Sequence, residues 1–405
     1  MTFKHLVLGS GGPVGFMMYG ALKELNKNNV WNIKDIESIY ATSVGSWLAT
    51  ILLLDLDWEW IDDFLIKRPL EKLANISKQD YLKILNLNGI IDSLDFMTKY
   101  FKPLFMAKDI DINITLKEFY DKTKVDLYIY TVNMNTLSII EEIELSHKSH
   151  PDLSLIKAIS MSSCVPFLFK PIIEDDKCYL DGAILKALPI NSCLNRNKLE
   201  ETLIFRHIET RDTLLAITDK TYVIDYIRIF ISKILYKLID ITKDMQITSP
   251  YTVDYYIDKN IYTNEYWFNI LNSKEERELL INTGIECGKI FHKRQLLKLE
   301  NERLETYNPD EKSDNQERGD NLESQQEEEA IRHDEENRES QDRESQQEEE
   351  AIRHDEENRE SQDRESQDRD DDKEDSIRDN EDRDNEDRDN NDNSYQTLEK
   401  RVSLK

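Results

Sequence analysis

Apolar runs and amphipathic segments alternate along the N-terminal half of the chain. Short apolar runs at Lys4–Leu8 and Ile36–Ala41 predict two buried strands, and the patterns at Phe16–Leu25 and Trp47–Leu54 predict the helices that follow them. Strands that alternate with helices are typical of a parallel sheet covered by helices. The sequence therefore predicts an α/β protein.

The same reading extends to about residue 300. The predicted helices are Asp57–Leu65, Tyr81–Leu87, Leu94–Phe105, Leu116–Tyr120, Ser154–Met161, Tyr222–Lys243 and one that begins at an N-cap Ser273 and ends near Lys298. The predicted strands are Asp126–Asn133, Leu137–Glu144, Lys177–Leu180 and Thr202–Phe205. We expect the apolar face of Tyr222–Lys243 to pack on the sheet; the alternative is a helix that caps a site or touches a membrane.

Charge separates the chain into two parts. The formal net charge is −29 over 405 residues, and Asn301–Lys405 alone holds 41 acidic and 17 basic residues. Within this part, Glu323–Arg343 is repeated as Glu344–Arg364. Because the segment has almost no apolar side chains, it cannot bury enough surface to offset the entropy lost on ordering. We predict that residues 306–405 form a disordered acidic repeat tail, a candidate for binding an unidentified partner.

Composition also excludes several classes of protein. No basic stripe is present, so nucleic-acid binding is not expected. No apolar run approaches the roughly 18 residues that a membrane span needs, so any membrane contact is expected to be peripheral and the protein cytoplasmic. The cysteines lack the spacing of a metal site and are typical of a reducing compartment. They are Cys164, Cys178, Cys193 and Cys287.

The glycine-rich segment Gly9–Gly15 follows the first predicted strand and precedes a helix. Such a turn either cradles a phosphate or supplies backbone N–H groups to an oxyanion, and a third interpretation is a helix start that needs glycine for packing. No Lys-Ser or Lys-Thr follows the glycines, and Ser10 interrupts the dinucleotide-binding pattern. The sequence favours an oxyanion-binding loop.

Ser43 stands between small residues where the second predicted strand meets its helix. The pattern Ala41-Thr42-Ser43-Val44-Gly45 is typical of a nucleophile elbow, a tight turn that leaves the serine hydroxyl accessible at the edge of the sheet. On these residues alone, an ordinary turn with Ser43 as a helix N-cap is an equal alternative.

Asp181 ends a short predicted strand and is followed by Gly182 and Ala183. This arrangement places a carboxylate at the edge of a sheet with little bulk beside it. Asp-Gly is also a common turn pair, so Asp181 by itself favours an ordinary turn.

Taken together and in this order, the glycine-rich turn, the serine elbow and Asp-Gly-Ala resemble the patatin-like phospholipase (PNPLA) family. The segment Ala158–Phe169 and the run Leu188-Pro189-Ile190 fit the same family, and the resemblance covers roughly residues 4–197. Smaller details, such as Ile66-Lys67-Arg68-Pro69, are most similar to patatin-like proteins of large DNA viruses.

The resemblance implies a three-layer α/β/α fold and a Ser–Asp dyad. Ser43 would be the nucleophile and Asp181 its base, with no metal or cofactor required. The resemblance assigns the oxyanion hole to the backbone N–H groups of Gly11, Gly12, Val14 and Val44. The supporting motif glycines are Gly15, Gly45 and Gly182. It further implies a catalytic domain at residues 4–197. Outside the resemblance, we predict a helical extension at residues 198–305 that packs on this domain.

Three positions depart from the family pattern. Val14 stands where the family often has arginine, Ala41 replaces the first elbow glycine, and Ala187 stands where the family frequently has asparagine. These differences leave the implied dyad in place, but they keep open a weakly active or inactive protein that binds lipid.

The resemblance implies a lipid acyl hydrolase that is similar to phospholipase A and acts on a lipid or membrane surface, in the host cytoplasm if the protein is viral. A Ser-His-Asp esterase is the second alternative, and His207 and His292 are its candidate bases. An acyltransferase is a weaker alternative, because Thr42 occupies the position before the serine where such relatives usually have histidine.

Overall fold

The computed structural model describes residues 2–74, 89, 91–137, 140–209, 217–219, 221, 226, 229–230, 233–234, 247, 249–257 and 264–307. The predicted helix Tyr81–Leu87, most of the predicted helix Tyr222–Lys243 and the predicted disordered tail from residue 308 onward lie outside these residues. Contacts group Met1–Leu304 into one unit, and the fold described below is that of this unit.

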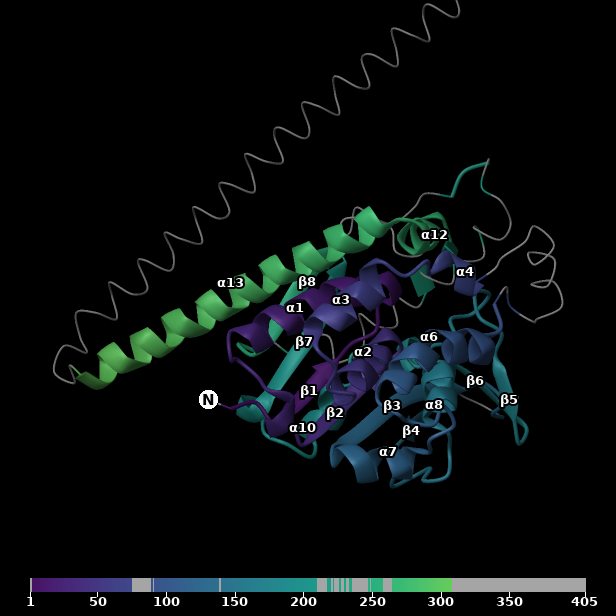
Figure 1. Cartoon of the computed structure of the whole chain (residues 1–405), viewed down its shortest axis with the longest axis horizontal. Helices are drawn as coiled ribbons and strands as arrows, with labels where there is room; N and C mark the ends of the chain where they lie inside the picture. The colour runs from purple at the N-terminus through teal and green to yellow at the C-terminus, as the bar shows by residue number, and fades with distance from the viewer. Residues whose placement is uncertain are drawn as a thin grey trace, which may run out of the picture. The chain divides into compact units, whose positions relative to one another are not determined.

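The described residues form one mixed sheet of eight strands in the order β5-β6-β3-β2-β1-β7-β8, with β4 also paired to β3 (Figure 1). Strands β1, β2, β3, β7 and β8 run parallel, whereas β4, β5 and β6 are joined through antiparallel pairs. The strands are β1 (His5–Leu8), β2 (Ser38–Thr42), β3 (Asp126–Asn133), β4 (Glu141–Leu145), β5 (Ile172–Glu174), β6 (Lys177–Asp181), β7 (Thr202–Glu209) and β8 (Thr252–Ile257).

Helices connect the strands and cover the sheet. They are α1 (Gly15–Lys27), α2 (Val44–Leu53), α3 (Trp58–Ile66), α4 (Glu71–Ala74), α6 (Ser93–Ala107), α7 (Leu116–Thr123), α8 (Leu155–Ser162), α9 (Ala183–Lys186), α10 (Ile190–Leu194), α12 (Asn264–Asn272) and α13 (Lys274–Tyr307). Short 3₁₀ turns lie at η1 (Gly12–Val14), η2 (Ile33–Asp35) and η4 (Leu199–Glu201). None of the described helices is both long and apolar enough to cross a lipid bilayer.

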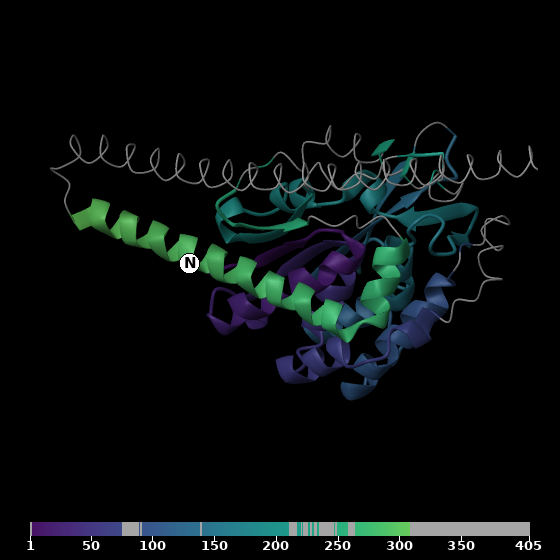
Figure 2. The ribbon, with the colours of Figure 1, turned by 90° about the horizontal axis from the view of Figure 1, so that it is seen from above.

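Side chains alternate between two cores on opposite faces of the sheet. Ile39 and Ala41 on β2 join the large core, whereas Tyr40 between them joins a small one. Along β3, Ile129 belongs to the large core and Tyr130 to the small one. The large core lies under helices such as α1, α2, α6 and α8, and the small core lies under α10. This arrangement confirms the predicted three-layer α/β/α fold (Figure 2).

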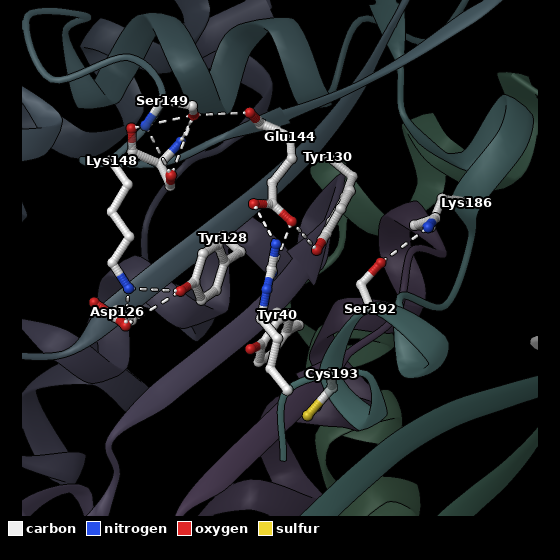
Figure 3. A network of polar contacts seen from close by, with 12 residues as sticks. Tyr40, Asp126, Tyr128, Tyr130, Glu144, Lys148, Ser149, Lys186, Ser192 and Cys193 are labelled. Carbon is white, nitrogen blue, oxygen red and sulfur yellow. Dashed lines mark hydrogen bonds and ion pairs between the residues drawn. The ribbon is translucent and has the colours of Figure 1, made fainter.

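The small-core face is closed by stacked rings and paired charges (Figure 3). Tyr40 and Tyr128 stack with their centroids 4.7 Å apart, and the Arg196 guanidinium lies 4.6 Å from the Tyr128 ring centre. Arg196 donates to both carboxylate oxygens of Glu144, at 2.8 and 3.0 Å, and the Tyr130 hydroxyl donates to the same carboxylate at 2.8 Å. These contacts cover β2 and β3 on the side opposite the helices that carry the site described below.

Helix α13 packs backbone to backbone against α1 (Figures 1 and 2). A β-carbon at Gly284 would lie 1.9 Å from the Met17 carbonyl oxygen, and one at Gly20 would lie 2.1 Å from the Ile281 carbonyl oxygen. The side chain of Ser273 caps α13 as predicted, because its Oγ accepts from the Glu276 N–H at 3.1 Å. The C-terminal segment therefore contacts the first helix of the fold, while the domain boundaries that we placed remain predictions.

The predicted elements differ from the observed ones mainly at their ends. Strand β3 has the predicted bounds, whereas β2 begins later and α2 earlier than predicted, so that Ser43 alone separates them. Strands β5 and β8 and helix α12 were not predicted. Tyr255 on β8 is fully buried, so that strand is stabilised by tertiary packing that periodicity does not report.

Candidate active site

Ser43 forms the whole connection between β2 and α2. Its backbone has φ 53° and ψ −124°, a conformation that costs a non-glycine residue roughly 1–3 kcal/mol. Gly45 lets the turn pack tightly, because a β-carbon there would lie 2.3 Å from the Leu8 carbonyl oxygen. Ala41 fits as a fully buried residue of β2. The backbone at Ser43 therefore has the sharp strand-to-helix turn that the sequence predicted.

The pairing of β3 brings Asp181 to this turn. Strands β2 and β4 both pair with Ile129 and Tyr130, so they lie on opposite sides of β3. Strands β4 and β6 both pair with Thr131, so β6 lies on the same side as β2. Thr42 pairs with Tyr130 and Asp181 with the next residue of β3, so the two strands meet end to end. Ser43 and Asp181 thus become neighbours through one register.

The two predicted side chains are in direct contact. The Ser43 hydroxyl donates to Oδ2 of Asp181 at 2.7 Å, and both residues are buried, at 5% and 4% exposure. The other carboxylate oxygen, Oδ1, accepts from the Ala183 N–H at 2.8 Å. Gly182 allows this approach, because a β-carbon there would lie 2.2 Å from the Tyr130 carbonyl oxygen. The geometry is that of a serine hydroxyl in direct contact with a base.

Burial changes the acidity of Asp181. Loss of solvation raises the pKa of its carboxyl group to about 6, although the Ala183 N–H and the Ser43 hydroxyl both act to lower it. A carboxylate with this pKa is a better proton acceptor than one in water, and it is still ionised at neutral pH.

The same burial makes Asp181 costly for folding at neutral pH. Its folded pKa lies above the unfolded value of about 3.9, so its contribution to stability is fully present below that value and is lost as pH rises through about 6. We expect Asp181→Asn to raise the free energy of unfolding by about 3 kcal/mol well above pH 6, and to leave it nearly unchanged in acid. Urea unfolding at both ends of this range measures the difference. A variant that is equally stable or less stable above pH 6 contradicts the assignment.

Ser162 holds the turn and the carboxylate in register, a role that the sequence analysis did not assign. Its fully buried hydroxyl accepts from the Ser43 N–H at 2.9 Å and donates to the Tyr130 carbonyl oxygen at 2.6 Å. Its own carbonyl oxygen accepts from the Gly182 N–H at 3.2 Å. The family-like segment Ala158–Phe169 contains Ser162, and that segment was the only signal that pointed to it.

The glycine-rich loop lies against the elbow. Gly11 and Gly12 have φ values of 142° and 53°, which favour glycine, and a β-carbon at Gly15 would lie 2.4 Å from Cγ2 of Val44. The Val14 N–H already donates to the Gly11 carbonyl oxygen at 3.1 Å, and the Val14 side chain is fully buried. Of the predicted oxyanion donors, Val14 is therefore engaged within the loop, which leaves Gly11, Gly12 and Val44 as the proposed donors.

The two histidines considered as alternative bases lie on separate elements. The ring of His207, on β7, borders the loop, since its Nδ1 would be 3.3 Å from a β-carbon at Gly11. His292 lies on α13. Because the Ser43 hydroxyl donates straight to Asp181, no imidazole stands between these two side chains. No cluster of three metal-ligating side chains occurs among the described residues.

An apolar cavity opens beside Ser43. Its volume, counted as the space that the centre of a water molecule can occupy, is about 90 Å³. This is several times the roughly 10–15 Å³ that one water molecule needs. Its lining is almost entirely aliphatic and aromatic, so water inside it finds few hydrogen-bond partners and an apolar ligand is favoured. Besides Ser43, the lining includes Phe16, Trp47, Leu48, Phe96 and Val165.

The fold and this pair of side chains define an α/β protein whose serine lies on a strand-to-helix elbow beside a buried carboxylate. Residues 6–194 match the family model described as patatin-like phospholipase. This match confirms the resemblance that the motifs predicted, over nearly the same residues.

Two curated viral proteins are similar to this chain. One is "Probable lipid hydrolase 463L" of Invertebrate iridescent virus 6, which is 25% identical over 47% of this chain and 62% of its own length. The other is "Uncharacterized protein R571" of Acanthamoeba polyphaga mimivirus, which is 27% identical over 46% of this chain and 60% of its own length. The chain thus spans about three fifths of the relatives that it matches. Both are proteins of large DNA viruses, as predicted.

Solved structures also resemble the chain at low identity. VipD from Legionella pneumophila is 15% identical and covers 70% of this chain and 67% of its own, with a TM-score of 0.38. ExoU, in its complex with SpcU from Pseudomonas aeruginosa, is 13% identical and covers 72% of this chain and 52% of its own, with a TM-score of 0.34.

Proposed function

We propose that this protein is a lipid acyl hydrolase that cleaves a fatty-acyl ester through Ser43 and Asp181. The observation that carries the proposal is the 2.7 Å hydrogen bond from the Ser43 hydroxyl to the buried Asp181 carboxylate, beside an apolar cavity that Ser43 lines. A serine alcohol becomes an effective nucleophile only when a base removes its proton, and Asp181 is in direct contact with that proton.

In the first half of the reaction, Oγ of Ser43 attacks the ester carbonyl carbon while its proton passes to Oδ2 of Asp181. The negative charge that forms on the carbonyl oxygen is stabilised by N–H groups of Gly11, Gly12 and Val44. When the C–O bond to the alcohol breaks, Asp181 returns the proton to the departing oxygen. The products are a free alcohol and an acyl group on Ser43.

In the second half, water attacks the acyl carbon and gives one proton to Asp181. The bond to Oγ of Ser43 then breaks, Asp181 returns its proton to Oγ, and a free fatty acid leaves. Every proton taken up by Asp181 is given back, so the cycle requires no other reactant than ester and water.

The shape and polarity of the site support a lipid as substrate. The cavity beside Ser43 offers an acyl chain an apolar surface in place of water. The family description and the name of the iridescent virus relative both refer to lipids, and we extend that substrate class to this chain. A lipid or membrane surface is thus the proposed site of action.

The proposal is tested by fatty-acid release from mixed phospholipid and neutral-lipid vesicles by the full chain. Because Asp181 must be ionised to accept a proton, we expect kcat/KM to rise with pH and level off above an apparent pKa near 6. An acid limb near the ordinary aspartate value of about 3.9 argues against a buried base. Absence of release over the whole pH range leaves the inactive lipid-binding protein as the better account.

A further inference from the structure

Helix α12 supplies one wall of the apolar cavity, although it lies beyond the residues that match the family model. Trp267, Ile270 and Leu271 line the same cavity as Ser43. The matched segment ends at residue 194. The residues at the centre of the proposed reaction and part of the surface that would contact the substrate therefore come from different stretches of the chain.

Trp267 lies directly against the glycine-rich loop. A β-carbon at Gly12 would be 2.3 Å from Cζ2 and 2.5 Å from Cη2 of the indole. An ester in position for attack must place its carbonyl group between Oγ of Ser43 and this loop. Of the two groups bonded to that carbonyl carbon, the one that faces α12 lies beside the indole, where a branch has little room.

Beyond this point the cavity extends along α2. Val44, Leu48 and Ile51 lie on successive turns of α2 and all line it, a run of about 10 Å at 1.5 Å per residue. Phe96 and Tyr100 of α6 also line it. This part of the cavity offers an apolar surface to a straight acyl chain.

Arg277 fixes α12 in its place. The side chain is 3% exposed, and its Nη1 donates to the carbonyl oxygens of Ile270 and Leu271 at the end of α12, each at 2.8 Å. Its Nη2 donates to the carbonyl oxygens of Ile66 and Arg68 at the end of α3, at 2.6 and 3.1 Å. A cation at two helix C-termini is favoured by both helix dipoles. The wall formed by α12 is thus tied to the body of the fold.

We propose that α12 determines substrate selectivity and that Trp267 restricts the site to esters of unbranched acyl chains. This inference rests on the proposed function for the reaction that Ser43 performs. The position of Trp267 in the cavity does not depend on that function. In this proposal the indole excludes a branch at the acyl carbon next to the carbonyl, and the part of the cavity along α2 receives the remainder of a straight chain.

The test compares hydrolysis of straight-chain and α-branched p-nitrophenyl esters of equal carbon number by the full chain. Shape discrimination in an apolar pocket is worth about tenfold or more. We expect wild type to prefer the straight ester, Trp267→Ala to lower that preference at least about tenfold, and Trp267→Phe to be intermediate. Trp60→Ala is the matched control, because Trp60 is exposed on α3 and does not line the cavity. An unchanged preference in Trp267→Ala overturns the inference.

A binding measurement separates this inference from the proposed function. In a Ser43→Ala background, displacement of a fluorescent fatty acid by straight and α-branched fatty acids reports the cavity without any chemistry. Loss of the straight-chain preference on adding Trp267→Ala supports the inference even if no ester is hydrolysed. Equal affinity of the Ser43→Ala protein for both kinds of acid contradicts it, whatever the activity of wild type.

Discussion

Ser43→Ala is expected to reduce fatty-acid release by at least about 10⁴-fold, because it removes the oxygen proposed to form the acyl intermediate. Asp181→Asn is expected to cause a loss of similar order, since an amide cannot accept the serine proton. In both variants the proposed oxyanion donors and the apolar cavity remain. Lipid binding should therefore persist while kcat collapses, and steady-state kinetics on vesicles or soluble esters measures both quantities.

The matched control for the aspartate is Asp176→Asn. Asp176 is exposed in the turn between β5 and β6, where its φ of 60° also suits asparagine. This variant should keep wild-type activity. If Ser43→Ala retains release comparable to wild type, the proposed chemistry is wrong. If His207→Ala or His292→Ala is as silent as Ser43→Ala, the base is a histidine and the Ser-His-Asp alternative holds.

The second large expected effect is a loss of folding stability at the contact between α13 and α1. Gly284→Ala places a methyl group 1.9 Å from the Met17 carbonyl oxygen and 2.6 Å from the Met17 carbonyl carbon. Neither is the flexible end of a side chain, so the two helices must separate. We expect the free energy of unfolding to fall by about 3 kcal/mol, the upper part of the usual range for overpacking. Urea unfolding followed by circular dichroism measures this change.

Gly288→Ala provides the comparison on the same helix. A β-carbon at Gly288 would lie 3.2 Å from the Ala21 carbonyl oxygen, so only a small adjustment is needed. Both variants gain about 1 kcal/mol of helix propensity, and their difference isolates the close contact at Gly284. Equal stability of the two variants contradicts backbone-to-backbone packing at Gly284.

Local sequence predicted most of the sheet but not its edges. Strand β3 was placed correctly because its β-branched and aromatic residues alternate between two buried faces. Strand β8 was missed, because its burial depends on contacts with distant segments of the chain. The same limit applies to α12, since periodicity does not reveal that Trp267 meets a loop far away in sequence.

The candidate site shows why separate motifs were ambiguous. Taken alone, Ser43 was as consistent with a helix cap as with an elbow, and Asp181 favoured an ordinary turn. Their contact depends on the register of β2 and β6 along β3, which is a property of the folded sheet and not of either turn. Only the order of several motifs, through the family resemblance, linked the two residues in advance.

The position of α12 has a consequence for how substrate preference evolves in such a protein. The residues proposed to perform the chemistry are encoded in the matched stretch 6–194, and part of the wall that contacts the acyl chain is encoded later in the gene. Mutation and recombination in the later stretch are thus able to alter the acyl-chain preference without changing the proposed catalytic residues. Homologues that share only the first stretch are expected to catalyse the same type of reaction and to differ in the lipids that they hydrolyse.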